Sequence, residues 1–266
     1  MHNSRYKKAS SRITRRSELK RTFGLILKIG LPIAFLIGLV WLLRADFLQV
    51  KNFEVLGLTT LSEQNVKSLA SDFATGTRLF LIPKSNILFI NKKDLANVLL
   101  NNFNQIEKVE VNKKFFSHQV QLKVAERKPE FLWCSQNKVC YFMTSNGLVF
   151  EKTENTKDKL IFEGVLTGDP LMQYFATPTQ IQNYLKLVEV FKKAGFAVAS
   201  FNIESADKAT AQTDLGVVIF NPDEVDLSLV AQNVLLLVNE TKIKNPSARF
   251  QYIDARFGNK MYYKTF

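Results

Sequence analysis

The pattern of apolar positions divides the chain into three parts. Residues 1–22 are polar and basic, and residues 23–43 form an apolar run whose only charge is Lys28. The rest of the chain alternates short apolar segments with polar turns, as folded domains do. At about 1.5 Å per residue, a helix as long as the run spans about 31 Å, close to the roughly 30 Å hydrocarbon core of a bilayer. The run therefore predicts a transmembrane helix at Phe23–Leu43.

The charges beside the run predict its orientation. Residues 1–22 hold eight Lys and Arg against one acid, Glu18, and such an excess stays in the cytoplasm. We expect a basic cytoplasmic tail that also attracts anionic lipid, a single-pass anchor in the cell membrane, and an extracytoplasmic C-terminal part. A cleaved signal peptide is the alternative, but its apolar core is normally about 7–15 residues long, and no small-residue cleavage site follows Leu43.

The first region after the run, residues 47–127, predicts the order strand, helix, helix, strand, strand. Its opening strand, residues 47–56, ends at Gly57, and Ser62 and Asn91 are suitable N-cap residues for the two helices, which a loop at residues 77–90 separates. Apolar residues at helical or alternating spacing are expected to face the core. They are Val66, Leu69, Ala70 and Phe73 in the first helix, Leu95, Val98, Leu99 and Phe103 in the second, and Val109, Val111, Val120, Leu122 and Val124 in strands Ile106–Asn112 and Gln119–Val124.

Arg127-Lys128-Pro129 marks the boundary to a second region, residues 130–266, because proline ends a strand. This region reads as a mixed β domain with two helices, which begin at Thr177-Pro178 and at Asp226. Strands are expected at 131–134, 140–144, from 148 onward, 160–166, 196–203, 215–220, 249–257 and 260–264. The expected helix stripes are Ile181, Tyr184, Leu185, Val188 and Phe191, then Leu227, Val230, Ala231, Val234, Leu235 and Val238. The predicted fold class is α+β.

Two cysteines flank a polar turn in this second region. Cys134 and Cys140 enclose five residues between apolar segments, so a hairpin centred on Asn137 places their sulfurs on facing residues. An extracytoplasmic location permits oxidation, and we expect a disulfide that stabilises the fold by about 2 kcal/mol. Two free, half-buried thiols are the alternative. Without partnering histidines, these cysteines do not form a zinc site.

Charge and motifs exclude several functions. The net charge is +12, but without the basic tail, Lys28 and Arg44 it falls to 26 Lys and Arg against 23 acids. Such a balance argues against a nucleic-acid-binding surface. The sequence holds no Gly-x-Ser-x-Gly elbow, no Walker loop and no His-Glu-x-x-His motif. We expect no enzymatic activity, cofactor or metal.

Two stretches resemble known families. Residues 47–127 resemble the POTRA (polypeptide-transport-associated) domain in their element order, in the opening Phe53-Glu54-Val55-Leu56-Gly57-Leu58-Thr59-Thr60-Leu61-Ser62, and in the exit Ala125-Glu126-Arg127-Lys128-Pro129. Over nearly its whole length the chain resembles the FtsQ/DivIB bacterial cell-division proteins. The most specific local match is the closing stretch 252–264, YIDARFGNKMYYK, which departs from the family pattern at Ala255 and Met261. Both remain apolar.

The resemblance implies a scaffold of the division machinery whose partners are FtsB- and FtsL-like single-span proteins. A POTRA-bearing component of polypeptide transport or envelope assembly is the alternative, although residues 130–266 are too short and too helical for a membrane β-barrel. A wall enzyme lacks a catalytic constellation here. Strand addition at a free sheet edge is the expected mode of binding.

The final hairpin is the expected partner surface, because a terminal strand can have a free edge. Met261 and Tyr263 should point to one face, and Lys260, Tyr262 and Lys264 to the other. If the Tyr262 N–H faces outward, a proline there should weaken partner capture. A plain closing strand of the core is the alternative. The expected partner-binding residues are Arg256, Phe257, Gly258, Asn259, Lys260, Met261, Tyr262 and Tyr263.

Overall fold

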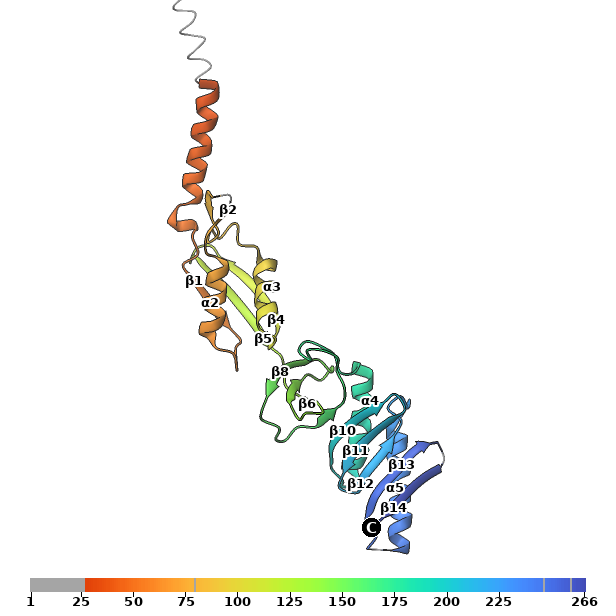
Figure 1. The fold of residues 1–266 in the computed structure, drawn as a ribbon. Helices are drawn as coiled ribbons and strands as arrows, with labels where there is room; N and C mark the ends of the chain where they lie inside the picture. The colour runs from red at the N-terminus through yellow and green to blue at the C-terminus, as the bar shows by residue number, and fades with distance from the viewer. Residues whose placement is uncertain (1–26, 79, 246, 259) are drawn as a thin grey trace, which may run out of the picture. The chain divides into compact units, whose positions relative to one another are not determined.

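The computed structural model describes residues 27–78, 80–245, 247–258 and 260–266, and it has a mixed α+β fold (Figure 1). The chain divides into two compact units. The N-terminal unit contains the described residues up to Asn102 together with Lys108–Ala125. The C-terminal unit contains Phe103–Glu107 and Glu126–Phe266.

The predicted membrane segment is described only in part. Residues 27–43 are helical. Across the described ranges, no helix combines the length and the apolar character that crossing a membrane requires. Residues 1–26, with the predicted basic tail and the first four residues of the predicted span, lie outside the described residues. The anchor therefore stays a prediction.

A three-stranded sheet and two helices form the body of the N-terminal unit. The strands have the order β1-β5-β4, with β1 parallel to β5, and α2 and α3 lie on one side of them (Figure 1). The helices bury Val66, Ala70, Leu95 and Leu99, and β5 buries Val120, Leu122 and Val124. The elements are η1 (Asp46–Leu48), β1 (Asn52–Leu56), α2 (Glu63–Phe73), β2 (Thr77–Arg78), β3 (Ile82–Pro83), α3 (Lys92–Asn102), β4 (Ile106–Lys114) and β5 (Gln119–Glu126).

The order strand, helix, helix, strand, strand is confirmed, with two corrections. The predicted strand at 47–56 begins only at Asn52, because the Val50 N–H donates to the Ser85 oxygen (2.8 Å) and the preceding residues form a 3-10 turn. The predicted loop at 77–90 contains a small antiparallel hairpin, β2 with β3. Five of the residues expected to face the core are half-buried: Leu69, Phe73, Val98, Phe103 and Val109.

The C-terminal unit is built on one mixed sheet of nine strands. Its order is β14-β13-β12-β11-β10-β9-β6-β7-β8, and the pairs β9–β10, β6–β9 and β12–β13 are parallel. Helices α4 (Pro178–Lys193) and α5 (Leu227–Lys244) accompany it. The strands are β6 (Phe131–Cys134), β7 (Cys140–Met143), β8 (Val149–Thr153), β9 (Ile161–Glu163), β10 (Val198–Ser205), β11 (Lys208–Thr213), β12 (Gly216–Phe220), β13 (Phe250–Phe257) and β14 (Lys260–Thr265).

Aromatic side chains fill the core between the helices and the sheet. Phe162, Phe191, Phe201 and Phe220 are fully buried. The ring centroid of Phe201 lies 5.4 Å from that of Phe162 and 5.2 Å from that of Tyr184 on α4. Each contact of this kind stabilises a fold by about 0.5–1.5 kcal/mol beyond what burial of the rings contributes. The core thus joins both helices to the middle of the sheet.

The main correction in this unit is a missed strand. The polar sequence Lys-Ala-Thr-Ala-Gln-Thr forms β11, which pairs with both β10 and β12. Its inward side chains are Ala209 and Ala211, which are fully buried. Alanine leaves room for Phe201 and Phe220 on the neighbouring strands, but it gives a weak strand signal. On α4, Leu187 is buried, whereas the expected Leu185 and Val188 are only partly buried.

We predict that Gly57→Ala destabilises the N-terminal unit more than Gly76→Ala does. Both glycines have positive φ, +90° and +85°, but a Cβ at Gly57 would lie 2.2 Å from the Val124 oxygen, while one at Gly76 meets nothing within 4 Å. The backbone strain is roughly 1–2 kcal/mol for either variant, and the clash adds about 1–3 kcal/mol at Gly57. Urea unfolding of the full chain, followed by circular dichroism, measures the difference. Equal midpoints for the two variants would contradict this packing.

Candidate functional site

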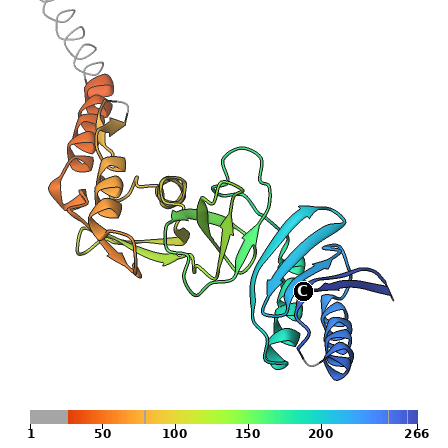
Figure 2. The ribbon, with the colours of Figure 1, turned by 60° about the horizontal axis from the view of Figure 1, so that its bottom comes forward.

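The predicted partner-binding residues come together in one hairpin at the edge of the large sheet. Arg256 and Phe257 end β13, Gly258 lies in the turn with φ of 63°, and Lys260–Tyr263 form most of β14 (Figure 2). Asn259 lies outside the described residues. β14 is the first strand of the sheet order and has β13 as its neighbour. One side of β14 therefore carries backbone groups that no described strand pairs with.

The other edge of the same sheet, β8, is partly covered. The Val149 N–H donates to the Gln173 oxygen (2.9 Å), and the Val149 oxygen accepts from the Met172 N–H (2.7 Å). Leu148 also forms a bridge with Tyr174. Residues 172–175 thus occupy the start of the β8 edge, as native proteins often do to block edge pairing. Of the two edges, β14 is the more accessible.

The direction of the β14 amides follows from the hydrogen bonds at its end. The Phe266 N–H donates to the Arg249 oxygen (3.1 Å), toward the β13 side. The pairing of β13 with β14 has two register shifts, and in each the extra residue belongs to β13. The alternation of backbone directions along β14 is therefore unbroken. Alternate residues of a strand direct their backbone groups to opposite sides. The Tyr262 and Lys264 amides therefore face β13, and those of Met261, Tyr263 and Thr265 face outward.

The sequence predicts that a proline at Tyr262 weakens partner capture if the Tyr262 N–H faces outward, and this condition is not met. That N–H faces inward, so a proline there removes a bond to β13 rather than one offered to a partner. Within the predicted set, Met261 and Tyr263 are the residues of β14 whose amides face outward. The sequence alone could not distinguish inward from outward amides, because the choice depends on which residues of β13 and β14 are paired.

The side chains of β14 alternate as expected. Met261 packs against the main core, and the Tyr263 ring lies edge-on to buried Phe250, with centroids 5.7 Å apart. Tyr262 is directed to the opposite face, where its ring contacts Phe257 at 5.4 Å. Tyr262 and Tyr263 are 56% and 46% exposed, so both remain accessible beside the free edge. A strand added there would meet one aromatic side chain on each face.

An ion pair stabilises β13 immediately before the turn. The Arg256 Nε and Nη2 atoms donate to the two Asp254 carboxylate oxygens at 2.9 and 2.7 Å, and the Arg256 backbone N–H donates to Oδ1 at 3.2 Å. Burial raises the pKa of the 8%-exposed Asp254, but these hydrogen bonds and the Arg256 charge outweigh it and hold the pKa below its usual value. The guanidinium also lies 5.3 Å from the Phe257 ring centroid. Sequence reasoning missed Asp254, although an acid and a base two residues apart on one strand are a usable signal.

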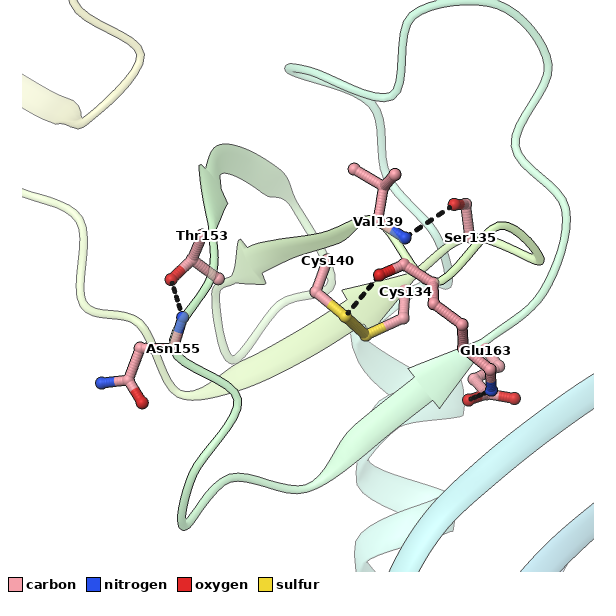
Figure 3. Close-up of a disulfide and its surroundings, with 8 residues drawn as sticks. Cys134, Ser135, Val139, Cys140, Thr153, Asn155 and Glu163 are labelled. Atoms are coloured by element: carbon pink, nitrogen blue, oxygen red, sulfur yellow. Dashed lines mark hydrogen bonds and ion pairs between the residues drawn. A yellow bond between two sulfur atoms is a disulfide. The ribbon is translucent and has the colours of Figure 1, made fainter.

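The two cysteines flank the turn of a different hairpin. Cys134 ends β6 and Cys140 begins β7; they are register partners, and the structure joins them by a disulfide bond (Figure 3). The bond packs with Leu132 and, at its border, with Phe142 and Ile161. The Val139 N–H donates to Ser135 Oγ (3.3 Å), and Lys138 pairs with Glu163 (3.0 Å). Oxidation in the cell stays a prediction.

The described residues offer no grouping of three or more His, Cys, Asp or Glu side chains that could hold a metal ion. The hairpin presents an open strand edge, two exposed tyrosines and a partly buried ion pair. Comparison with known proteins adds no assignment. No family model matches the chain, and no curated protein matches it significantly.

We predict that Asp254→Asn destabilises the C-terminal unit by roughly 1–3 kcal/mol at neutral pH, because it weakens charge-assisted hydrogen bonds. A carboxyl whose pKa is lower in the folded state stabilises the fold above its unfolded pKa of about 3.9, and this contribution is lost as the pH falls through the folded pKa. The variant's deficit should therefore shrink in acid. Urea unfolding at pH 7 and pH 3 measures it. Glu154→Gln, in an exposed bend, is the control and should match the wild type at pH 7. A deficit as large at pH 3 as at pH 7 would be evidence against this role for the carboxylate.

Proposed function

We propose that this protein is a non-enzymatic, membrane-anchored scaffold of the bacterial cell-division machinery. It binds other single-span division proteins through its extracytoplasmic part, where a partner segment adds as a strand to β14. The observation that carries the proposal is the open outer side of β14, with the amides of Met261, Tyr263 and Thr265 directed away from β13. Backbone bonds supply affinity in this mode, and alternate side chains supply selectivity.

The POTRA resemblance is supported by the element order of the N-terminal unit and by Gly57. The resembling motif has glycine at the end of the first strand, and here that residue has φ of +90° with no space for a Cβ. Its presence therefore has a physical reason in this fold. The β-α-α-β-β order is what the resemblance implies for residues 47–127, and the structure adds that β1 is parallel to β5.

The closing-stretch resemblance is supported by the contacts of its residues. Residues 252–264 coincide with the β13–β14 hairpin, and Asp254 and Arg256 of that stretch form the ion pair. Ile253 and Ala255 are buried, so the departure at Ala255 keeps an apolar residue in the core. The predicted anchor at Phe23–Leu43, with the basic tail before it, would place this hairpin outside the cytoplasm beside FtsB- and FtsL-like partners.

We predict that Tyr263→Pro lowers partner capture about five-fold or more relative to Tyr263→Ala. Both variants lack the tyrosine ring, but only proline lacks the outward N–H, and a lost backbone hydrogen bond is worth about 1 kcal/mol. Capture is measured by crosslinking cells, purifying the tagged full-length chain and quantifying the co-purified proteins. Circular dichroism should show both variants folded.

The identity of the captured proteins tests the function, and the pair of variants tests the edge. Peptidoglycan synthases and small coiled-coil membrane proteins in the eluate support the scaffold, whereas outer-membrane or secreted chains support polypeptide transport instead. Equal capture by the folded proline and alanine variants would falsify strand addition at β14.

A further inference from the structure

The end of the helix at residues 27–43 is hydrogen-bonded to the N-terminal unit. The Leu43 oxygen accepts from Asn86 Nδ2 (2.7 Å) and from Gln49 Nε2 (3.2 Å), and Asn86 is fully buried. Just beyond, the Ile87 N–H donates to the Leu48 oxygen (2.8 Å). These bonds satisfy carbonyl groups that a helix end leaves free. They also bring residues 85–88 to the place where the helix ends.

Two further turns lie at this same end of the unit. The Lys51 N–H donates to the His118 oxygen (2.9 Å), which brings the β4–β5 turn beside the start of β1, and Lys113 Nζ donates to the Leu88 oxygen (3.1 Å). The β2–β3 turn belongs to a hairpin that ends at Pro83, shortly before residues 85–88, and that lies beside the helix end (Figure 1). The helix end, the two turns and the 85–88 segment together are called the helix-proximal rim below.

The helix-proximal rim exposes large apolar side chains. Phe116 is wholly exposed and Phe80 is 93% exposed. One exposed apolar residue needs no explanation, but several gathered at one end of a small unit indicate an interaction surface. The exposed large apolar residues of the rim are Phe47, Phe80, Leu81, Leu88, Phe115 and Phe116.

The charge of the rim is strongly positive. Residues 42–51, 77–88 and 113–118 hold six Lys and Arg against one acid, Asp46, and one of the six, Lys114, is paired with Glu54 of β1 (2.8 Å). Arg44, Arg78 and Lys84 are exposed. Lys113 is half-buried, and burial, together with the nearby Lys92 charge, lowers its pKa. Exposed aromatic rings interspersed with basic side chains match the boundary between acyl chains and anionic headgroups.

We propose that the helix-proximal rim rests on the outer surface of the membrane, with the Phe80 and Phe115–Phe116 turns in the interfacial layer and the basic side chains on anionic headgroups. This inference rests on the proposed membrane anchor. It favours lipid over a protein partner because the rim lies next to the point at which the chain would leave the bilayer. The unit would then be fixed against the membrane at that end, with its orientation set by the lipid contact.

A thiol introduced in place of Phe116 gives a direct test. Both native cysteines are in the disulfide, so Phe116→Cys supplies a single reactive site for an environment-sensitive NBD fluorophore. The matched control is Asn101→Cys, which is exposed near the far end of α3, roughly 14 Å along the helix from Lys92. The full-length variants are reconstituted into vesicles of phosphatidylcholine with phosphatidylglycerol and carry doxyl-labelled lipid as a quencher.

The label at position 116 should be quenched by doxyl lipid several-fold more than the label at position 101, and iodide in the outer solution should quench it several-fold less. The difference in quenching between the two labels should be smaller in vesicles of phosphatidylcholine alone. An unchanged difference would overturn the contact between the basic side chains and anionic headgroups. Flotation with the vesicles distinguishes a failure of the membrane anchor from a failure of the lipid contact at the rim. A chain that fails to float contradicts the anchor and this inference together. A chain that floats while iodide quenches both labels equally contradicts this inference alone. In that case a protein partner is the occupant of the rim.

Discussion

A single row of paired residues on the core side of the large sheet sets the geometry of the C-terminal unit. Register partners run from Trp133 through Phe162, Phe201, Ala211, Val218 and Ile253 to Tyr263 on the last strand. All except Tyr263 are buried. A slip of one residue in β14 would turn Tyr263 away from Phe250 and bring Tyr262 toward the core, so packing fixes the register. The register in turn fixes which amides face outward.

The row links core packing to the orientation of the open edge. Because Tyr263 faces the core side, its amide must face the open edge, and the same holds for Met261. The Asp254–Arg256 pair lies within this hairpin, on β13, and the Arg256–Phe257 and Phe257–Tyr262 contacts connect it to the outer face. The other edge of the sheet is partly covered by residues 172–175. One sheet thus carries a protected edge and an accessible one, and the accessible edge is held in place by the core.

Much of the fold was predictable where periodicity was strong. The α2, α3, α4 and α5 helices, the β6–β7 hairpin and the alternation of Val120, Leu122 and Val124 all followed from spacing. The expected caps of α3, α4 and α5 accept backbone hydrogen bonds through their side chains, whereas Ser62 is the N-cap of α2 without such a bond. β11 was not predictable in this way, because its buried residues are alanines that fit beside phenylalanines of other strands. The sequence indicated the Asp254–Arg256 pair locally, through an acid and a base two residues apart on one strand. Nothing in the sequence near Tyr263 indicated that its amide faces outward. The apolar rim also went unnoticed, because Phe47, Phe80 and Phe116 are far apart in sequence and come together only through the bonds of residues 48–51 and 85–88.

Amide-resolved hydrogen exchange along β14 tests the central claim most directly. The full-length protein should be measured alone in detergent micelles and then in a complex with the proposed membrane partners. In the protein alone, the Tyr262 and Lys264 amides should exchange slowly, and those of Met261, Tyr263 and Thr265 quickly. In the complex, the outward set should become protected while the inward set changes little. Slow exchange of Tyr263 in the protein alone, or rapid exchange of all three outward amides in the complex, would contradict the free edge or its use.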